Sequence, residues 1–175
     1  MKYPFTFDEE QAIEAIVYIA QNVKEPTFHR ISKVMYFADK AHLEQYGRFI
    51  SGDSYVAMKH GPVPISSYEI LKSVRGDGKT SCLAQAKNAF CVQNKYLVKP
   101  LRQADCDYLS DSDLECLDKA IKEYGALSFQ ELTELSHDSA WHNADENDCI
   151  ELEQIVFMFA NAKPLLEHLK NPFPS

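Results

Sequence analysis

The stretch SGDSYVAMKHGPVPISSYEIL, residues 51–71, limits the possible folds more than any other part of this chain. Its residues 53–60 are rich in strand formers, and Gly61, Pro62 and Pro64 end them. Glycine reaches backbone conformations closed to other residues, whereas proline fixes its own φ angle. Proline also suits the first turn of a helix, where no amide donor is lost. The stretch therefore predicts a short strand, a rigid corner and then a helix.

Cap and stop signals predict helices along most of the remaining chain. The residue pairs at capping-box spacing are Thr6 and Glu9, Ser110 and Asp113, Ser128 and Glu131, and Asp148 and Glu151. Gly47 and Gly125 are expected stops, because glycine favours the end of a helix. The first predicted helix begins near TFDEE, residues 6–10, and others span residues 27–46, 65–74, 110–124 and 148–159, with a kink or restart at Pro164. A further predicted helix begins at Ser128 and carries Leu132 and Leu135.

Residues 89–100, AFCVQNKYLVKP, instead predict two short strands around the turn at residues 93–95. At 175 residues and 45% hydrophobic composition, the chain can bury about 70% of its unfolded surface and build a core. The predicted fold is α+β and mainly α, with five to seven helices and a small antiparallel β-sheet or hairpins. We expect a single compact domain over residues 1–175.

The environment of the protein is also suggested by the sequence. No apolar run approaches the roughly 20 residues that a membrane helix needs. The N-terminus, MKYPFTFDEE, turns acidic at once and carries no apolar signal segment. The five cysteines form no CxxC pair, and an odd number argues against a disulfide framework. We therefore expect a cytoplasmic protein with reduced thiols and no membrane contact.

Charge is distributed unevenly along the chain. Residues 103–153 hold 2 lysines against 15 Asp and Glu, whereas residues 1–102 hold 14 Lys and Arg against 10 Asp and Glu. An acidic segment repels phosphate backbones, so nucleic acid is not the expected partner. The segment either steers a basic protein partner or is a solvated face that keeps the protein soluble.

The second predicted helix holds the most reactive side chains. His42 falls within its apolar stripe, and a buried imidazole needs a partner, either Asp39 at the i,i+3 spacing or a group from residues 53–60. The chemical alternative is a metal-dependent hydrolase whose site would be Asp39, His42 and His60, if these side chains converge. A core histidine with satisfied hydrogen bonds is the favoured interpretation.

The segment LSHDSAWHNA, residues 135–144, is the second cluster. His137 and His142 lie five residues apart, a poor spacing for one metal on one helix. Trp141, the only tryptophan, is either a core anchor or a contact for a partner. Because no phosphate-binding loop, dinucleotide fingerprint or GxSxG motif occurs, we expect no catalytic residue, no metal, no cofactor and no enzymatic activity.

Residues 35–64 (MYFADKAHLEQYGRFISGDSYVAMKHGPVP) and 124–141 (YGALSFQELTELSHDSAW) resemble the Panacea domain, also described as SocA-like antitoxins or as a phage-associated domain of unknown function. The resemblance implies an antitoxin that neutralises a toxin encoded by a neighbouring gene through direct contact. In one branch of the family it acts as an adaptor that delivers the toxin to a protease. A phage or prophage regulatory protein is a further alternative.

The candidate partner-binding or motif residues combine the family pattern with the strand geometry. Alternation places Met58 and His60 on one face of the strand and Tyr55 on the other. The first face either packs on the second helix or is presented to a partner. The full set is Asp39, His42, Tyr46, Asp53, Tyr55, Met58, His60, Pro62, His137 and Trp141.

Overall fold

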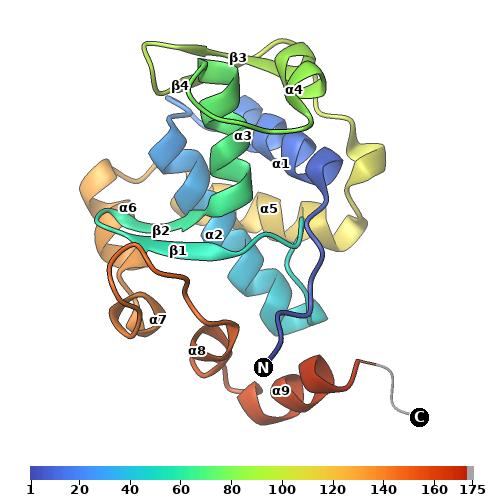
Figure 1. The fold of residues 1–175 in the computed structure, drawn as a ribbon, viewed down its shortest axis with the longest axis vertical. Helices are drawn as coiled ribbons and strands as arrows, with labels where there is room; N and C mark the ends of the chain where they lie inside the picture. The colour runs from blue at the N-terminus through green and yellow to red at the C-terminus, as the bar shows by residue number, and fades with distance from the viewer. Residues whose placement is uncertain (173–175) are drawn as a thin grey trace.

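The computed structural model describes residues 1–172, which form nine α-helices and two antiparallel two-stranded sheets (Figure 1). This confirms the mainly α class, and the number of helices exceeds the expected five to seven because the short helices α4 and α7 were not predicted. The elements in chain order are α1 (Glu9–Asn22), α2 (Phe28–Tyr46), β1 (Tyr55–Met58), β2 (Gly61–Pro64), α3 (Ile65–Arg75), α4 (Leu83–Ala89), β3 (Phe90–Gln93), β4 (Leu97–Pro100), α5 (Asp111–Tyr124), α6 (Phe129–Ser136), α7 (Ser139–His142), α8 (Leu152–Val156) and α9 (Ala162–Lys170).

Local capping sets the ends of the long helices. The Thr27 side chain accepts a hydrogen bond from the backbone N–H of Arg30 and starts α2, and Gly47 ends it with a φ of 77°. Such a left-handed conformation costs glycine little. Capping boxes at Ser110 and Ser128 open α5 and α6. The predicted bounds of α2 and α5 and the predicted start of α6 are therefore confirmed.

Helix α1 begins within the predicted stretch of residues 6–10, but its predicted cap is wrong, and so is the predicted start of the helix after Asp148. The cap of α1 is Asp8, whose carboxylate accepts from the Gln11 N–H, and not Thr6. Thr6 instead packs against Gly52: a Cβ added to Gly52 would lie 2.2 Å from the Thr6 carbonyl oxygen. The predicted helix over residues 148–159 shrinks to α8, because the backbone of Asp148 pairs with β1 instead.

The GPVP segment is a strand and not only a corner. β1 and β2 pair antiparallel, with Tyr55 opposite Pro64 and Met58 opposite Gly61. The other edge of β1 is bonded by residues 147–150, since the Ala57 N–H donates to the Asp148 carbonyl at 2.9 Å. The prolines are tolerated because β2 is an edge strand. β1 is thus held on both sides by segments far apart in the sequence.

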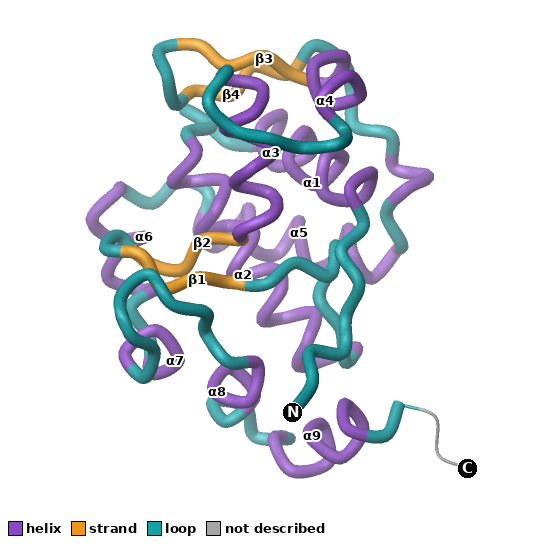
Figure 2. The backbone as a smooth tube through the Cα atoms, viewed as in Figure 1, coloured by secondary structure: helices purple, strands orange, loops and turns teal. Residues whose placement is uncertain are grey.

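Helix α2 runs through the centre of the molecule. It packs along α5 and against β2 and α6, and Figure 2 shows β1 and β2 lying across it. One cluster of buried apolar side chains draws on residues from Ala12 in α1 to Leu169 in α9. At one end of the molecule α3, α4, β3 and β4 gather together (Figure 1). Among the described residues no helix has the length and apolar character required to span a membrane.

Candidate partner-binding site

Asp39 lies at the centre of the fold and is fully buried. One carboxylate oxygen accepts from the Ile50 N–H at 2.7 Å and the other from the Tyr55 hydroxyl at 2.6 Å. Burial raises the pKa of Asp39 to about 7, although both hydrogen bonds act to lower it. Asp39, one of the two alternatives considered as the partner of His42, therefore does not bond to it. Asp39 instead ties α2 to the loop that precedes β1.

His42 is buried, as predicted, but its partners come from elsewhere. Its Nδ1 lies 2.8 Å from the Arg48 carbonyl, and its Nε2 lies 2.9 Å from Ser112 Oγ and 3.2 Å from Asp113 Oδ1. Burial acts to raise the pKa of Asp113, yet hydrogen bonds from His42 and Ser110 and the nearby Arg48 charge hold it below its usual range. His42 is a bonded core histidine that joins α2 to α5.

Asp53 acts as a cap for a helix that lies twelve residues further along the chain. Its carboxylate accepts from the backbone N–H groups of Ser66 and Ser67, at 3.0 and 2.8 Å. Helix α3 needs this help because its own N-cap residue is Pro64, which makes no side-chain cap bond. The Asp53 backbone carbonyl in turn accepts from the Tyr3 hydroxyl. The role of Asp53 is therefore to join β1 to α3.

Lys33 is a buried base that the sequence analysis missed. Only 1% of it is exposed, and its ammonium donates to the Pro62 carbonyl at 2.8 Å. Burial lowers the pKa of Lys33 to about 7. At Gly61, with a φ of 113°, an added Cβ would lie 2.7 Å from Lys33 Cε and 2.4 Å from Ser136 Oγ. Glycine and proline at these positions let β2 approach α2 closely.

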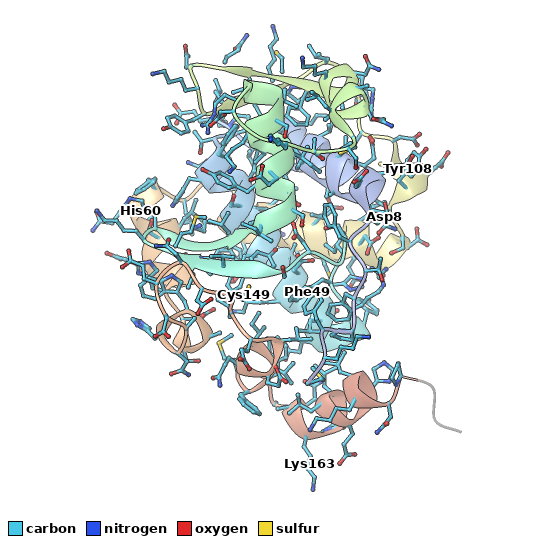
Figure 3. All side chains as sticks on the ribbon, viewed as in Figure 1. Asp8, Phe49, His60, Tyr108, Cys149 and Lys163 are labelled. Carbon is cyan, nitrogen blue, oxygen red and sulfur yellow. The ribbon has the colours of Figure 1, made fainter. Side chains whose placement is uncertain are left out.

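His60 does not join Asp39 and His42. Its side chain is exposed beside the β1–β2 turn, at the edge of the molecule in Figure 3 and away from Phe49. Phe49 packs against Tyr55, the partner of Asp39. Within residues 1–172 no group of three or more His, Cys, Asp or Glu is placed to hold a metal ion. The residues of the hydrolase hypothesis therefore do not converge.

Four of the candidate residues do meet on the surface. The indole N–H of Trp141 donates to the Met58 carbonyl at 2.9 Å, and the His137 ring stacks on Trp141 with centroids 3.7 Å apart. His60 lies in the turn that follows Met58. Met58 is half-buried at the end of β1 and His60 is exposed in the turn that follows, so this end of the hairpin reaches the surface. Val56, on the same face of β1 as Met58, is buried, and Tyr55 packs on Tyr36 of α2.

Phe129, in the first turn of α6, extends this surface and was also missed. It is 52% exposed, with the His29 ring stacked on it at 3.9 Å and the His60 ring edge-on at 5.2 Å. His29 in turn contacts Thr133 Oγ1 at 3.0 Å, and burial lowers the pKa of His29 to about 3. The signal in the sequence was an apolar residue directly after the Ser128 cap.

These side chains form one surface, which we call the His–aromatic patch. A pocket of about 370 Å³ lies beside Trp141 and is lined also by Ala57, Lys59 and His142. Exposed aromatic rings are frequent at protein interfaces, where they supply contact area at low entropic cost. The patch consists of Met58, Lys59, His60, Phe129, His137, Trp141 and His142.

The remaining candidates lie elsewhere. Tyr46 is 46% exposed near the C-terminal end of α2, and its hydroxyl donates to Glu115 at 2.6 Å. Pro62 is buried in β2 against Lys33. Of the 15 acidic side chains in residues 103–153, 12 are exposed, so the acidic segment is largely a solvated surface.

The fold and the surface define a mainly helical domain with a bonded polar interior and an exposed aromatic face, a class suited to protein binding. Residues 31–142 match the family described as antitoxin SocA-like, Panacea domain, so the chain belongs to this family. No curated protein and no solved structure matches the chain.

Proposed function

We propose that this protein is an antitoxin that neutralises a toxin encoded next to it by direct contact. The family match supports an antitoxin-type role. The observation that carries the proposal further is the position of the candidate residues: Asp39, His42, Asp53 and Tyr55 are buried, whereas the His–aromatic patch is open to a partner. The buried residues hold the fold, and the patch binds.

The patch is well built for recognition. Its rings are held in place before binding, because Trp141 is bonded to the Met58 carbonyl and Phe129 is stacked on His29. A surface that is already ordered loses less conformational entropy when a partner docks. Half-exposed aromatic side chains of this kind are the residues that most often dominate binding energy.

Coexpression with the adjacent gene tests the proposal. We expect the neighbour to be toxic alone and harmless with this protein, and the two to copurify. The double variant Phe129→Ala/His60→Ala should weaken the complex at least tenfold and restore toxicity. The matched control is Phe157→Ala/His168→Ala, which removes the same two side-chain types from exposed positions outside the patch. The proposal is wrong if the neighbour is harmless alone, or if both double variants bind equally well.

The exposed acidic side chains should affect the rate of association. Replacing Asp107 and Asp111 by lysine should slow binding of a basic toxin about threefold to tenfold at low salt. The thermal unfolding temperature should fall only slightly, because Asp111 lies in the first turn of α5, where a positive charge is unfavourable. An unchanged association rate, measured by stopped-flow fluorescence, would assign this face a purely solubilising role.

Delivery of the toxin to a protease is the second part of the proposal. If the protein is an adaptor, the toxin's half-life in cells should shorten when the protein is present and recover when the protease is deleted. If the half-life of the toxin is the same with and without this protein, neutralisation occurs by binding alone and the adaptor role is wrong. We also propose that the protein performs no catalytic step, since its buried Asp39, Tyr55 and His42 hold loops and helices together.

A further inference from the structure

The end of the molecule formed by α3, α4, β3 and β4 has a charge opposite to that of the rest. Residues 65–102 carry 7 Lys and Arg and only 2 Asp and Glu, whereas the whole chain carries 18 and 26. Over residues 1–102 as a whole the excess is only 14 Lys and Arg against 10 Asp and Glu. Figure 1 shows that these four elements gather at one end, so the charge is concentrated there.

The two acidic residues within residues 65–102 are already paired, and Arg102 pairs with Glu14 of the neighbouring α1 at 2.5 Å. Glu69 binds Lys72 at 2.8 Å, and Asp77 binds Arg75 at 2.7 Å. Four further lysines are exposed, and none of them forms an ion pair with any residue that the structure describes. These four are Lys79, Lys87, Lys95 and Lys99.

The β3–β4 hairpin holds this surface in place. Asn94 and Lys95 make its turn with φ values of 51° and 69°. The Val98 N–H donates to the Pro26 carbonyl at 2.9 Å, so the outer edge of β4 is bonded to the segment before α2. Arg75 donates to the Lys95 carbonyl at 3.0 Å. The lysines are thus carried on an anchored backbone, which lowers the entropic cost of binding.

Apolar side chains lie beside the charges. Tyr96, in the hairpin turn, is 56% exposed, and Leu101, just after β4, is 53% exposed. The inward-facing Phe90 and Val98 are buried in the core, which leaves Lys99 on the outer face opposite Cys91. We call the set Lys79, Lys87, Lys95, Tyr96, Lys99 and Leu101 the basic end.

We propose that the basic end binds an acidic segment of another protein, separately from the His–aromatic patch. Its unpaired lysines attract carboxylates, and Tyr96 and Leu101 offer apolar contact that a peptide can use. A long nucleic acid fits less well, because the chain as a whole has a charge of −8 and its other surfaces repel phosphates. A short acidic peptide needs only the local surface, since charges further away are screened over about 8 Å at physiological salt.

Fluorescence anisotropy tests this with a labelled 12-residue peptide of eight glutamates and four leucines. Wild type should bind it, and affinity should fall at least fivefold between 50 and 200 mM NaCl. The variant Lys87→Glu/Lys95→Glu/Lys99→Glu should bind at least tenfold more weakly. The control Lys122→Glu/Lys163→Glu/Lys170→Glu, with equal charge change at exposed positions outside the basic end, should change affinity less than twofold.

Three results would overturn the proposal: no binding by wild type, equal loss in both triple variants, or binding of a 20-base-pair duplex DNA as tight as that of the peptide. The proposal is distinguishable from the antitoxin function. The basic-end variant should still neutralise the toxin, and Phe129→Ala/His60→Ala should still bind the acidic peptide.

Discussion

Helix α2 buries charged side chains in two regions, and the two are treated differently. Toward residues 48–55 and α5, Asp39 accepts from Ile50 and Tyr55, and both ring nitrogens of His42 have polar partners. Toward β2, Lys33 donates to one carbonyl, that of Pro62, and forms no ion pair with a carboxylate among residues 1–172. We call the surroundings of Asp39 and His42 the bonded region, and the surroundings of Lys33 the Lys33 region.

The two regions show how the hydrogen-bond partners of a buried polar group determine its effect on stability. The hydrogen bonds of Asp39 and His42 offset part of the cost of burying these groups, so the bonded region can fix the loop before β1. A buried ammonium without a counter-ion remains costly, and its pKa falls as a result. The pKa values of Asp39 and Lys33 both lie at about 7, reached from opposite directions. Depth of burial is the same, and only the partners differ.

The largest expected effect comes from breaking the bonded region at Asp39. Asp39→Ala would leave the Ile50 N–H and the Tyr55 hydroxyl buried without an acceptor. Each stranded group costs about 1–3 kcal/mol, so the free energy of unfolding should fall by about 3–5 kcal/mol. Urea denaturation measures it, with exposed Asp145→Ala as the control. Equal stability of the two variants would remove the contrast between the regions.

The pH dependence gives a second measurement on the same variant. Burial raises the pKa of Asp39 from 3.8 to about 7, so the folded state holds a proton that the unfolded state has released between these values. The contribution of Asp39 to stability is therefore full below about pH 4 and is lost as pH rises toward 7. Asp39→Ala should flatten this part of the stability profile relative to wild type.

His42→Leu tests the other half of the bonded region. The substitution strands the Arg48 carbonyl and the Ser112 and Asp113 side chains, while leucine keeps most of the volume. We expect a loss of about 1–3 kcal/mol, smaller than for Asp39, because Asp113 keeps Arg48 as a partner. Thermal unfolding compares it with exposed His168→Leu. A stabilised His42→Leu protein would contradict a bonded histidine.

The elements of this fold were predictable where their signals are local. Thr27 and Gly47 bound α2 because a side-chain cap and a left-handed glycine act within a few residues. The strand β2 was missed, because no local pattern in GPVP predicts its pairing with β1. Residues 147–150 were missed for the same reason, because their partners lie about ninety residues away.

The same limit applies to the site. Sequence reasoning found Met58, His60, His137 and Trp141, and the structure brings them to one surface. Both alternatives for the partner of His42, Asp39 and a group from residues 53–60, were wrong, because the pattern of α2 does not reveal the loop carbonyl and the α5 side chains that bond to it. Phe129, His29 and Lys33 gained their roles from contacts between α2, α6 and β2, which periodicity along one helix does not reveal.

The Lys33 region should respond in the opposite direction, with the smallest change. Lys33→Met replaces a buried base by an apolar chain of similar length. The free energy of unfolding at pH 7 should rise by about 1–2 kcal/mol, even though the Pro62 carbonyl loses its donor.

The stability of the wild-type protein should also depend on pH through Lys33. Because the folded pKa of Lys33 is about 7 and the unfolded value is 10.5, the folded state binds fewer protons between these values, and wild-type stability should increase with pH across this range. The gain from Lys33→Met should therefore be full at pH 7 or below and fade toward pH 10, whereas exposed Lys24→Met should show neither effect. A Lys33→Met protein that is less stable than wild type at pH 7 would mean that the ammonium is as well compensated as Asp39, and the two regions would no longer differ.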